Sequence, residues 1–111
     1  MKFEENTING IFALKVLEGR IVADIAPQFK ADMIAYIQRG NRKIILDLSH
    51  VAFIDSSGLG ALIGTLKAIG NDGELVLCGL QDAVVNMFKL TRMNKVFRIF
   101  ENPEEAASAL A

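Results

Sequence analysis

The pattern of apolar and polar residues at the start of the chain predicts β-strands. The stretch IFALKVLEGRI, residues 11–21, approximates an alternating pattern, with one side formed by Ile11, Ala13, Lys15 and Leu17 and the other by Phe12, Leu14 and Val16. Alternation with period two is typical of a strand. We therefore expect a strand over these residues, paired as a hairpin with residues 2–5 across the sequence NTING.

Two kinds of apolar pattern take turns along the rest of the chain. Short apolar runs at 43–49, 74–80 and 96–100 predict strands, and the first two have the composition of central strands buried on both faces. Apolar residues recur at helical spacing in 26–39, 57–69, 82–91 and 104–110. Asp24 and Asp82 stand where N-caps are expected, and Pro27 suits a first helical turn, where its missing N–H costs nothing.

This order of elements predicts a single α/β domain over residues 1–111. Strands and helices that alternate with short connections form a sheet with parallel segments, with helices covering at least one face. The opening hairpin adds an antiparallel pair of strands at one edge, so we expect a mixed sheet. No Pro- or Gly-rich linker, internal repeat or low-complexity tract divides the chain.

Composition and charge narrow the possible functions. With 51% hydrophobic and 23% charged residues, the chain has enough apolar side chains to fold around a core. Twelve Lys and Arg against thirteen Asp and Glu give a formal net charge of -1, which disfavours a nucleic-acid partner. No stretch resembles a signal peptide or a membrane helix, so we expect a cytoplasmic protein without a membrane partner.

Few residues are available for catalysis or metal binding. His50 and Cys78 are the only residues of their kinds, so a metal would find mainly carboxylates, and these lack the spacing of a calcium loop. Cys78 lies in an apolar strand and is expected in the core. The serines near His50 lack the glycine-flanked elbow of a hydrolase, and no phosphate-binding glycine motif is complete. We therefore expect a protein that is not an enzyme and holds neither a cofactor nor a metal.

The sequence FIDSSGLGALIG, residues 53–64, places two serines and three glycines where an apolar helix begins. Asp55 is a good N-cap, and Ser56, Ser57 and Gly58 fill the first turn. Free N–H groups and the positive end of the helix dipole attract an anion or a phosphate there. In the simpler interpretation, Asp55 caps the helix, the serines satisfy backbone groups and the glycines allow close packing.

The two sides of this helix favour a further role. At about 100° per residue, one side is formed by Leu59, Leu62, Ile63, Leu66 and Ile69, which are suited to the core. The opposite side, called here the small-residue face, consists of Ser57, Gly60, Ala61, Gly64 and Ala68. Exposed glycines cost roughly 0.5 to 1 kcal/mol each relative to alanine, so folding does not reward this choice. We interpret the small-residue face as a docking surface with Ser56 at its rim, where a phosphate would add about -1.5 to -2 charges.

These residues resemble the anti-sigma factor antagonist family, the bacterial members of the STAS domains. The similarity rests on LEGRI at 17–21, IILDLSHVAFIDSSGLGALI at 44–63, GELVLCGL at 73–80 and VFRIFENPEEAASAL at 96–110, with the D-S-S-G-L-G motif as its most specific part. The resemblance implies a mixed sheet of four or five strands with helices mainly on one face.

The resemblance also implies a mechanism of partner switching. In such a mechanism, the dephosphorylated protein binds an anti-sigma factor that is also a serine kinase, and a sigma factor is released. The kinase then phosphorylates the serine that follows the motif aspartate, and a PP2C-type phosphatase reverses this step. The acceptor is then Ser56 rather than Ser57. The implied partner-binding residues are Asp24, Asp55, Ser56, Ser57, Gly58, Gly60, Ala61, Gly64 and Ala68.

Two alternatives remain open at this level. A non-switching STAS assembly or scaffold subunit would use the same small-residue face without phosphorylation. A small nucleotide-binding regulatory domain would instead use the helix terminus at Ser56 for phosphate groups.

Overall fold

An Asn-Gly turn folds the first two strands into a hairpin. The computed structural model describes residues 1–111, and in it strand β1 (Phe3–Ile8) and strand β2 (Ile11–Val16) are joined by Asn9 and Gly10 alone. Both turn residues have positive φ, 52° and 82°, which suits the twist of a two-residue hairpin turn. The hairpin is confirmed, but its first strand extends to Ile8 because the turn takes only two residues.

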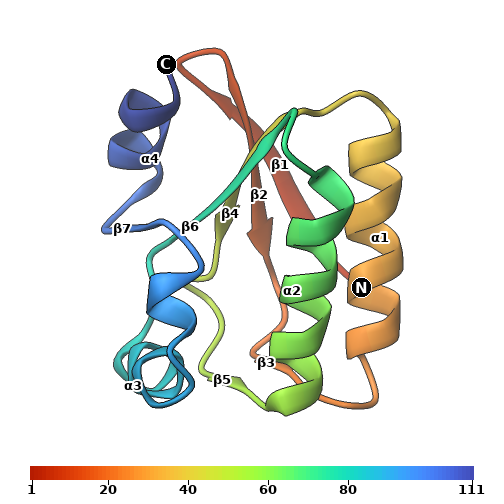
Figure 1. Ribbon diagram of the computed structural model, residues 1–111, viewed down its shortest axis with the longest axis vertical. Helices are drawn as coiled ribbons and strands as arrows, with labels where there is room; N and C mark the ends of the chain where they lie inside the picture. The colour runs from red at the N-terminus through yellow and green to blue at the C-terminus, as the bar shows by residue number, and fades with distance from the viewer.

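Strands and helices alternate along the rest of the chain, with two exceptions, as Figure 1 shows. The other strands are β3 (Arg20–Ile21), β4 (Lys43–Asp47), β5 (Phe53–Ile54), β6 (Glu74–Cys78) and β7 (Ile99–Phe100). The helices are α1 (Ala26–Gln38), α2 (Ser56–Ile69), α3 (Asp82–Leu90), the 3-10 helix η1 (Met93–Lys95) and α4 (Pro103–Leu110). The exceptions are that β5 directly follows β4 and that η1 directly follows α3. Pro27 lies in the first turn of α1, as predicted.

Five strands form one mixed sheet in the order β1-β2-β4-β6-β7. Strand β1 is antiparallel to β2, and all the other pairs in this sheet are parallel. The register places Leu14, Leu46 and Leu77 side by side on one face of the sheet. The residues that precede them, Ala13, Ile45 and Val76, lie side by side on the opposite face. Both rows are buried, which explains the continuous apolar runs of the central strands.

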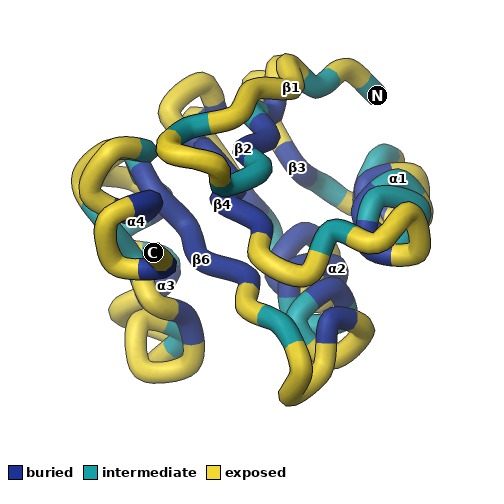
Figure 2. The backbone as a smooth tube through the Cα atoms, turned by 90° about the horizontal axis from the view of Figure 1, so that it is seen from above, coloured by how far each residue is buried: buried dark blue, intermediate teal, exposed yellow.

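The two faces of the sheet have different covers. Three helices, α1, α2 and α3, contribute to a core cluster of 21 buried residues that includes Leu14, Leu46 and Leu77. On the other face, α4 closes a cluster of 7 buried residues, and its Ala106, Ala107 and Leu110 pack there with Cys78. Figure 2 shows α4 and the pair α1 and α2 on opposite sides of β4 and β6. The predicted α/β sheet with helices mainly on one face is therefore confirmed.

Some local expectations are wrong. The region 11–21 is two strands rather than one, because β3 leaves the main sheet after Val16 and pairs in parallel with β5. The strand expected at 96–100 is reduced to Ile99–Phe100, since η1 and the turn after it occupy the preceding residues. Asp82 lies inside the first turn of α3, and the N-cap position is taken by Gln81 without a side-chain bond.

Candidate functional site

The start of α2 is held by the carboxylate of Asp55. This residue has the extended backbone of an N-cap, with φ -95° and ψ -175°, and its Oδ1 accepts a hydrogen bond from the N–H of Gly58 at 2.9 Å. One of the free donors of the first turn is thereby satisfied. The predicted capping role of Asp55 is confirmed.

The same carboxylate also holds the segment that precedes α1. Its Oδ2 accepts a hydrogen bond from the N–H of Ala23 at 3.1 Å. Nearby, the N–H of Ala52 donates to the carbonyl oxygen of Gly19 at 2.8 Å, and β3 pairs with β5. Asp55 therefore connects the turn before α1 to the start of α2, two parts of the chain that lie far apart in sequence.

Gly58 has a packing role at the same place. It is buried, and a Cβ built on it would collide with the carbonyl oxygen of Ile21 and lie 2.7 Å from Cγ2 of Ile54. Helix α2 can approach β3 and β5 this closely only because residue 58 has no side chain. The simpler interpretation, close packing, therefore holds for this glycine, and because Gly58 is buried its predicted part in partner binding stays a prediction.

Ser56 and Ser57 occupy the first two positions of α2, and both are exposed. They lie at the end of the molecule where β3, β5 and the first turn of α2 meet, at the bottom of Figure 1. The N-terminal turn of α2 faces outward there, so an anionic group on either hydroxyl would lie at the positive end of the helix dipole.

The small-residue face is only partly exposed. Helices α1 and α2 lie side by side, and Ala61 is buried with 6% of its surface exposed. Gly64 is half-buried beneath the side chain of Lys30, whose Cε lies 2.7 Å from where a Cβ at position 64 would stand. The expectation of a free surface is wrong at Ala61 and holds only in part at Gly64, which the end of the Lys30 side chain covers, because α1 packs on this side of α2. Ser57, Gly60 and Ala68 remain exposed.

A groove of about 360 Å³ lies where the two helices begin, and it is called here the α1/α2 groove. It is lined by Ala23, Ala26, Pro27, Lys30, Ser57, Gly60 and Ala61. Lys30 is the only charged residue of the lining. A Cβ at Gly60 would meet nothing within 4 Å, so packing inside the domain does not require this glycine. Ser57 and Gly60 therefore line a groove next to Ser56, whereas Ala68, the third exposed residue of the small-residue face, is not part of its lining.

The α1 side of this groove was not found from the sequence. Ala26 and Lys30 lie four residues apart and so share one side of α1, which the sequence could have indicated. The packing of this side on the small residues of α2 is a tertiary contact, and no local sequence pattern predicts it.

Asp24 has a different position from the one expected. The N-cap of α1 is Ile25, which makes no side-chain hydrogen bond, so the predicted capping role of Asp24 is wrong. Asp24 is exposed in the turn between Ala23 and α1. Its role as a partner contact stays a prediction.

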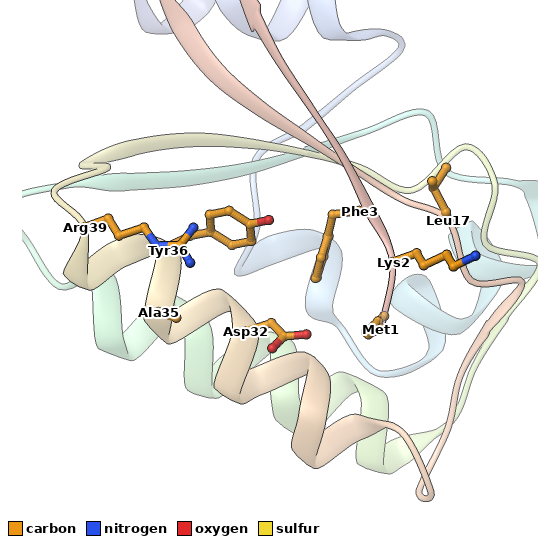
Figure 3. A pocket seen from close by; sticks show the side chains of 8 residues that line it. All are labelled: Met1, Lys2, Phe3, Leu17, Asp32, Ala35, Tyr36 and Arg39. Atoms are coloured by element: carbon orange, nitrogen blue, oxygen red, sulfur yellow. The ribbon is translucent and has the colours of Figure 1, made fainter.

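A second cavity, of about 400 Å³, lies between β1 and α1 (Figure 3). It is lined by Met1, Lys2, Phe3, Leu17, Asp32, Ala35, Tyr36 and Arg39. The hydroxyl of Tyr36 donates to Oε2 of Glu5 at 3.1 Å, and the guanidinium of Arg39 lies 4.9 Å from the centre of the Tyr36 ring. Burial, followed by the hydrogen bond to Glu5, raises the pKa of Tyr36. No predicted site residue lines this cavity.

The remaining candidates for chemistry lie in the core or apart from each other. Cys78 is fully buried, and burial, with the nearby charge of Asp47 as a smaller cause, raises its pKa to about 12. A neutral thiol is the expected form, and the predicted core position is confirmed. No three His, Cys, Asp or Glu residues are grouped so that they could hold a metal ion. None of the helices combines the length and the apolar composition needed to cross a bilayer.

Comparisons with known proteins agree with this arrangement. The family model described as STAS domain matches residues 3–106. The Bordetella bronchiseptica protein BtrV, named as a proposed anti-sigma factor antagonist, is 31% identical over 98% of this chain and 94% of its own length. The anti-sigma-B factor antagonist of Staphylococcus aureus is 30% identical over 94% of this chain and 96% of its own. Among solved structures, an anti-sigma factor antagonist from Mycobacterium paratuberculosis superposes with a TM-score of 0.86 at 23% identity, over 97% of this chain and 92% of that one.

Proposed function

The chain belongs to the STAS domain family, and from this premise we propose that it is an anti-sigma factor antagonist controlled by phosphorylation of Ser56. In its dephosphorylated form it binds an anti-sigma factor that is also a serine kinase, so that a sigma factor is released. A PP2C-type phosphatase restores the binding form. The relatives at 30% and 31% identity, which carry the name of such antagonists along nearly their whole length, support this role.

The single observation that carries the proposal is the position of Ser56. Its exposed hydroxyl directly follows the half-buried cap Asp55 and lies at the start of a helix beside the α1/α2 groove. A kinase can reach a hydroxyl in this position without unfolding the domain. The helix is anchored by Asp55 and Gly58, so the acceptor is presented on a rigid element.

The charge around the groove explains how a phosphate would act. It would add about -1.5 to -2 charges beside a surface whose only charged lining residue is Lys30. The helix N-terminus tolerates this charge inside the domain. A partner that seats an apolar side chain or a carboxylate near Lys30 would be repelled, because the phosphate is strongly hydrated and competes for the same cation. Phosphorylation would then dissociate the complex and leave the fold intact.

The test uses the anti-sigma factor kinase encoded by the source organism. Incubation with this kinase and ATP, followed by intact-protein mass spectrometry, should add one phosphate group to the wild-type chain and to Ser57→Ala, and none to Ser56→Ala. Binding measured by titration calorimetry should be retained by Ser56→Ala and weakened at least about tenfold by phosphorylation, a change of about 1.4 kcal/mol.

Other outcomes would contradict the switch. A phosphate that survives Ser56→Ala would place the acceptor elsewhere. Tight binding with no phosphorylation would favour a non-switching assembly subunit. Binding of ATP to the isolated chain, without a kinase, would favour the nucleotide-binding alternative.

A further inference from the structure

Positive charge is concentrated in one segment of this nearly neutral chain. Residues 83–100 contain Lys89, Arg92, Lys95 and Arg98, four of the twelve Lys and Arg residues, and none of the thirteen Asp and Glu residues. The one ion pair in the structure joins Arg98 to Glu74 at 2.9 Å. Lys89, Arg92 and Lys95 are exposed and pair with no carboxylate of the chain.

Two exposed large apolar side chains belong to the same segment as these cations. Leu90, the last residue of α3, has 84% of its surface exposed, and Val96, just after η1, has 48%. The same segment also contains Phe88 and Phe97, which are buried and pack with their rings 6.0 Å apart. Phe88 and Phe97 therefore anchor this segment to the core. Leu90 and Val96 are not needed for that anchoring and remain exposed to solvent.

Arg92, which lies between Leu90 and Val96 in the sequence, has an unfavourable backbone conformation. Arg92 has φ 61°, in the left-handed region that Gly and Asn adopt more easily. The turn from α3 into η1 would form at lower energy with glycine there. An arginine at this position adds nothing to the packing of the domain, since it is exposed, but it does add a charge between Leu90 and Val96.

Helix α3, which carries Lys89 and Leu90, lies at the same end of the molecule as the start of α2. Helix α3 contacts β5, and β5 leads directly through Asp55 into α2. Phe53 in β5 is 45% exposed, and the guanidinium of Arg20 lies 5.5 Å from the centre of its ring. Figure 1 shows α3, β5 and the first turn of α2 along the lower edge of the molecule. One large partner could therefore contact both regions.

We propose that Lys89, Leu90, Arg92, Lys95 and Val96, called here the basic-apolar patch, form a second docking surface for an acidic protein segment that carries apolar side chains. The inference rests on the proposed function, because the segment is assigned to the same anti-sigma partner. The three cations favour a partner segment with negative charge, and the exposed Leu90 and Val96 favour apolar side chains on the same segment. A lipid surface is less suited, because stable attraction to anionic lipid takes about four to eight clustered cations and the patch has three.

Isotope-labelled protein and a short synthetic peptide of Glu and Leu residues provide the first test. Addition of this peptide should shift the amide resonances of residues 89–96 in nuclear magnetic resonance spectra, whereas a peptide of Lys and Leu should not. Leu90→Ser and Lys95→Glu should each reduce the shifts. Lys67→Glu, an exposed cation on α2 outside the patch, is the matched control and should leave them unchanged. These side chains are exposed, so the variants should keep the fold.

The same variants test the link to the partner. Lys95→Glu should weaken binding of the anti-sigma factor kinase by about tenfold, mainly at low salt, and Lys67→Glu should not. The proposal is overturned if both peptides act alike, if the shifts lie outside 89–96, or if only phosphatidylglycerol vesicles perturb these residues. The peptide measurement involves neither Ser56 nor a kinase, so its failure is distinct from failure of the phosphorylation switch.

Discussion

The carboxylate of Asp55 and the backbone N–H of Ala23 are joined by a hydrogen bond of 3.1 Å that spans 32 residues of sequence. Ala23 lines the α1/α2 groove, and Asp55 immediately precedes the exposed Ser56. One side chain therefore fixes the position of the proposed phosphorylation site relative to the proposed docking groove. Capping of α2, its second role, uses the other carboxylate oxygen.

The two bonds of Asp55 make its replacement more costly than loss of an ordinary cap. We expect Asp55→Ala to lower the free energy of unfolding by about 2 kcal/mol, about 1 for the cap and about 1 for the bond to Ala23. Asn102→Ala is the matched control, because Asn102 caps α4 through a bond from the N–H of Glu105 at 2.9 Å, and its only other side-chain bond is a long, exposed one from Nδ2 to Oε2 of Glu105 at 3.4 Å. Urea unfolding measures both variants, and an equal loss would mean that the bond to Ala23 contributes nothing.

The two glycines of α2 near Ser56 should respond in opposite directions to alanine. Gly58→Ala places a methyl group against the carbonyl oxygen of Ile21 and should destabilise the domain by about 1–3 kcal/mol. Gly60→Ala meets open space and should stabilise it by about 0.5–1 kcal/mol through helix propensity. Thermal or urea unfolding decides the signs. Stabilisation by Gly58→Ala would contradict the close approach of α2 to β3.

A larger side chain at Gly60 should separate binding from folding. Gly60→Gln extends into the α1/α2 groove, so it should weaken binding of the anti-sigma factor kinase by at least about tenfold while unfolding stays unchanged or shifts upward. Ser108→Gln, at an exposed position of α4 on the other face of the sheet, is the control and should bind normally. Normal binding by Gly60→Gln would move the docking surface away from the groove.

Burial of Cys78 predicts a dependence of stability on alkaline pH. Its pKa is raised to about 12 in the folded protein, whereas the pKa of a thiol in the unfolded chain is about 8.5. The folded state therefore keeps a proton that the unfolded state loses, and the stability present below the unfolded pKa falls as the pH rises from there toward 12.

Urea midpoints measured from about pH 7 to pH 10 should decline more steeply for the wild type than for Cys78→Ala. The alanine variant also loses stability because of the space left in the core, so the slopes are compared and not the absolute values. The native thiol should also react with a disulfide reagent only at the rate of unfolding. Equal slopes, or rapid reaction of the folded protein, would contradict the buried, neutral thiol.

Much of the fold could be predicted because its signals are local. The Ile and Leu content of 43–49 and 74–80 indicated strands buried on both faces, and the register of Leu14, Leu46 and Leu77 fits that prediction. Asp55 as a cap and Pro27 in a first turn depend on backbone groups within a few residues, so spacing alone is enough to find them. The capping predictions for Asp24 and Asp82 are wrong, because a suitable residue type near a helix start does not fix where the helix begins.

The sequence by itself determined the order of the elements, the mixed α/β sheet and the start of α2 at Asp55, since each depends on periodicity or on neighbours in the chain. Only the tertiary structure decided which small residues of α2 remain exposed. Helical angle puts Ala61, Gly64 and Gly60 on one side of α2, but α1 then covers the first two and leaves the third open. Packing between helices distant in sequence fixes that division, because burial depends on which neighbour arrives and not on the residue alone.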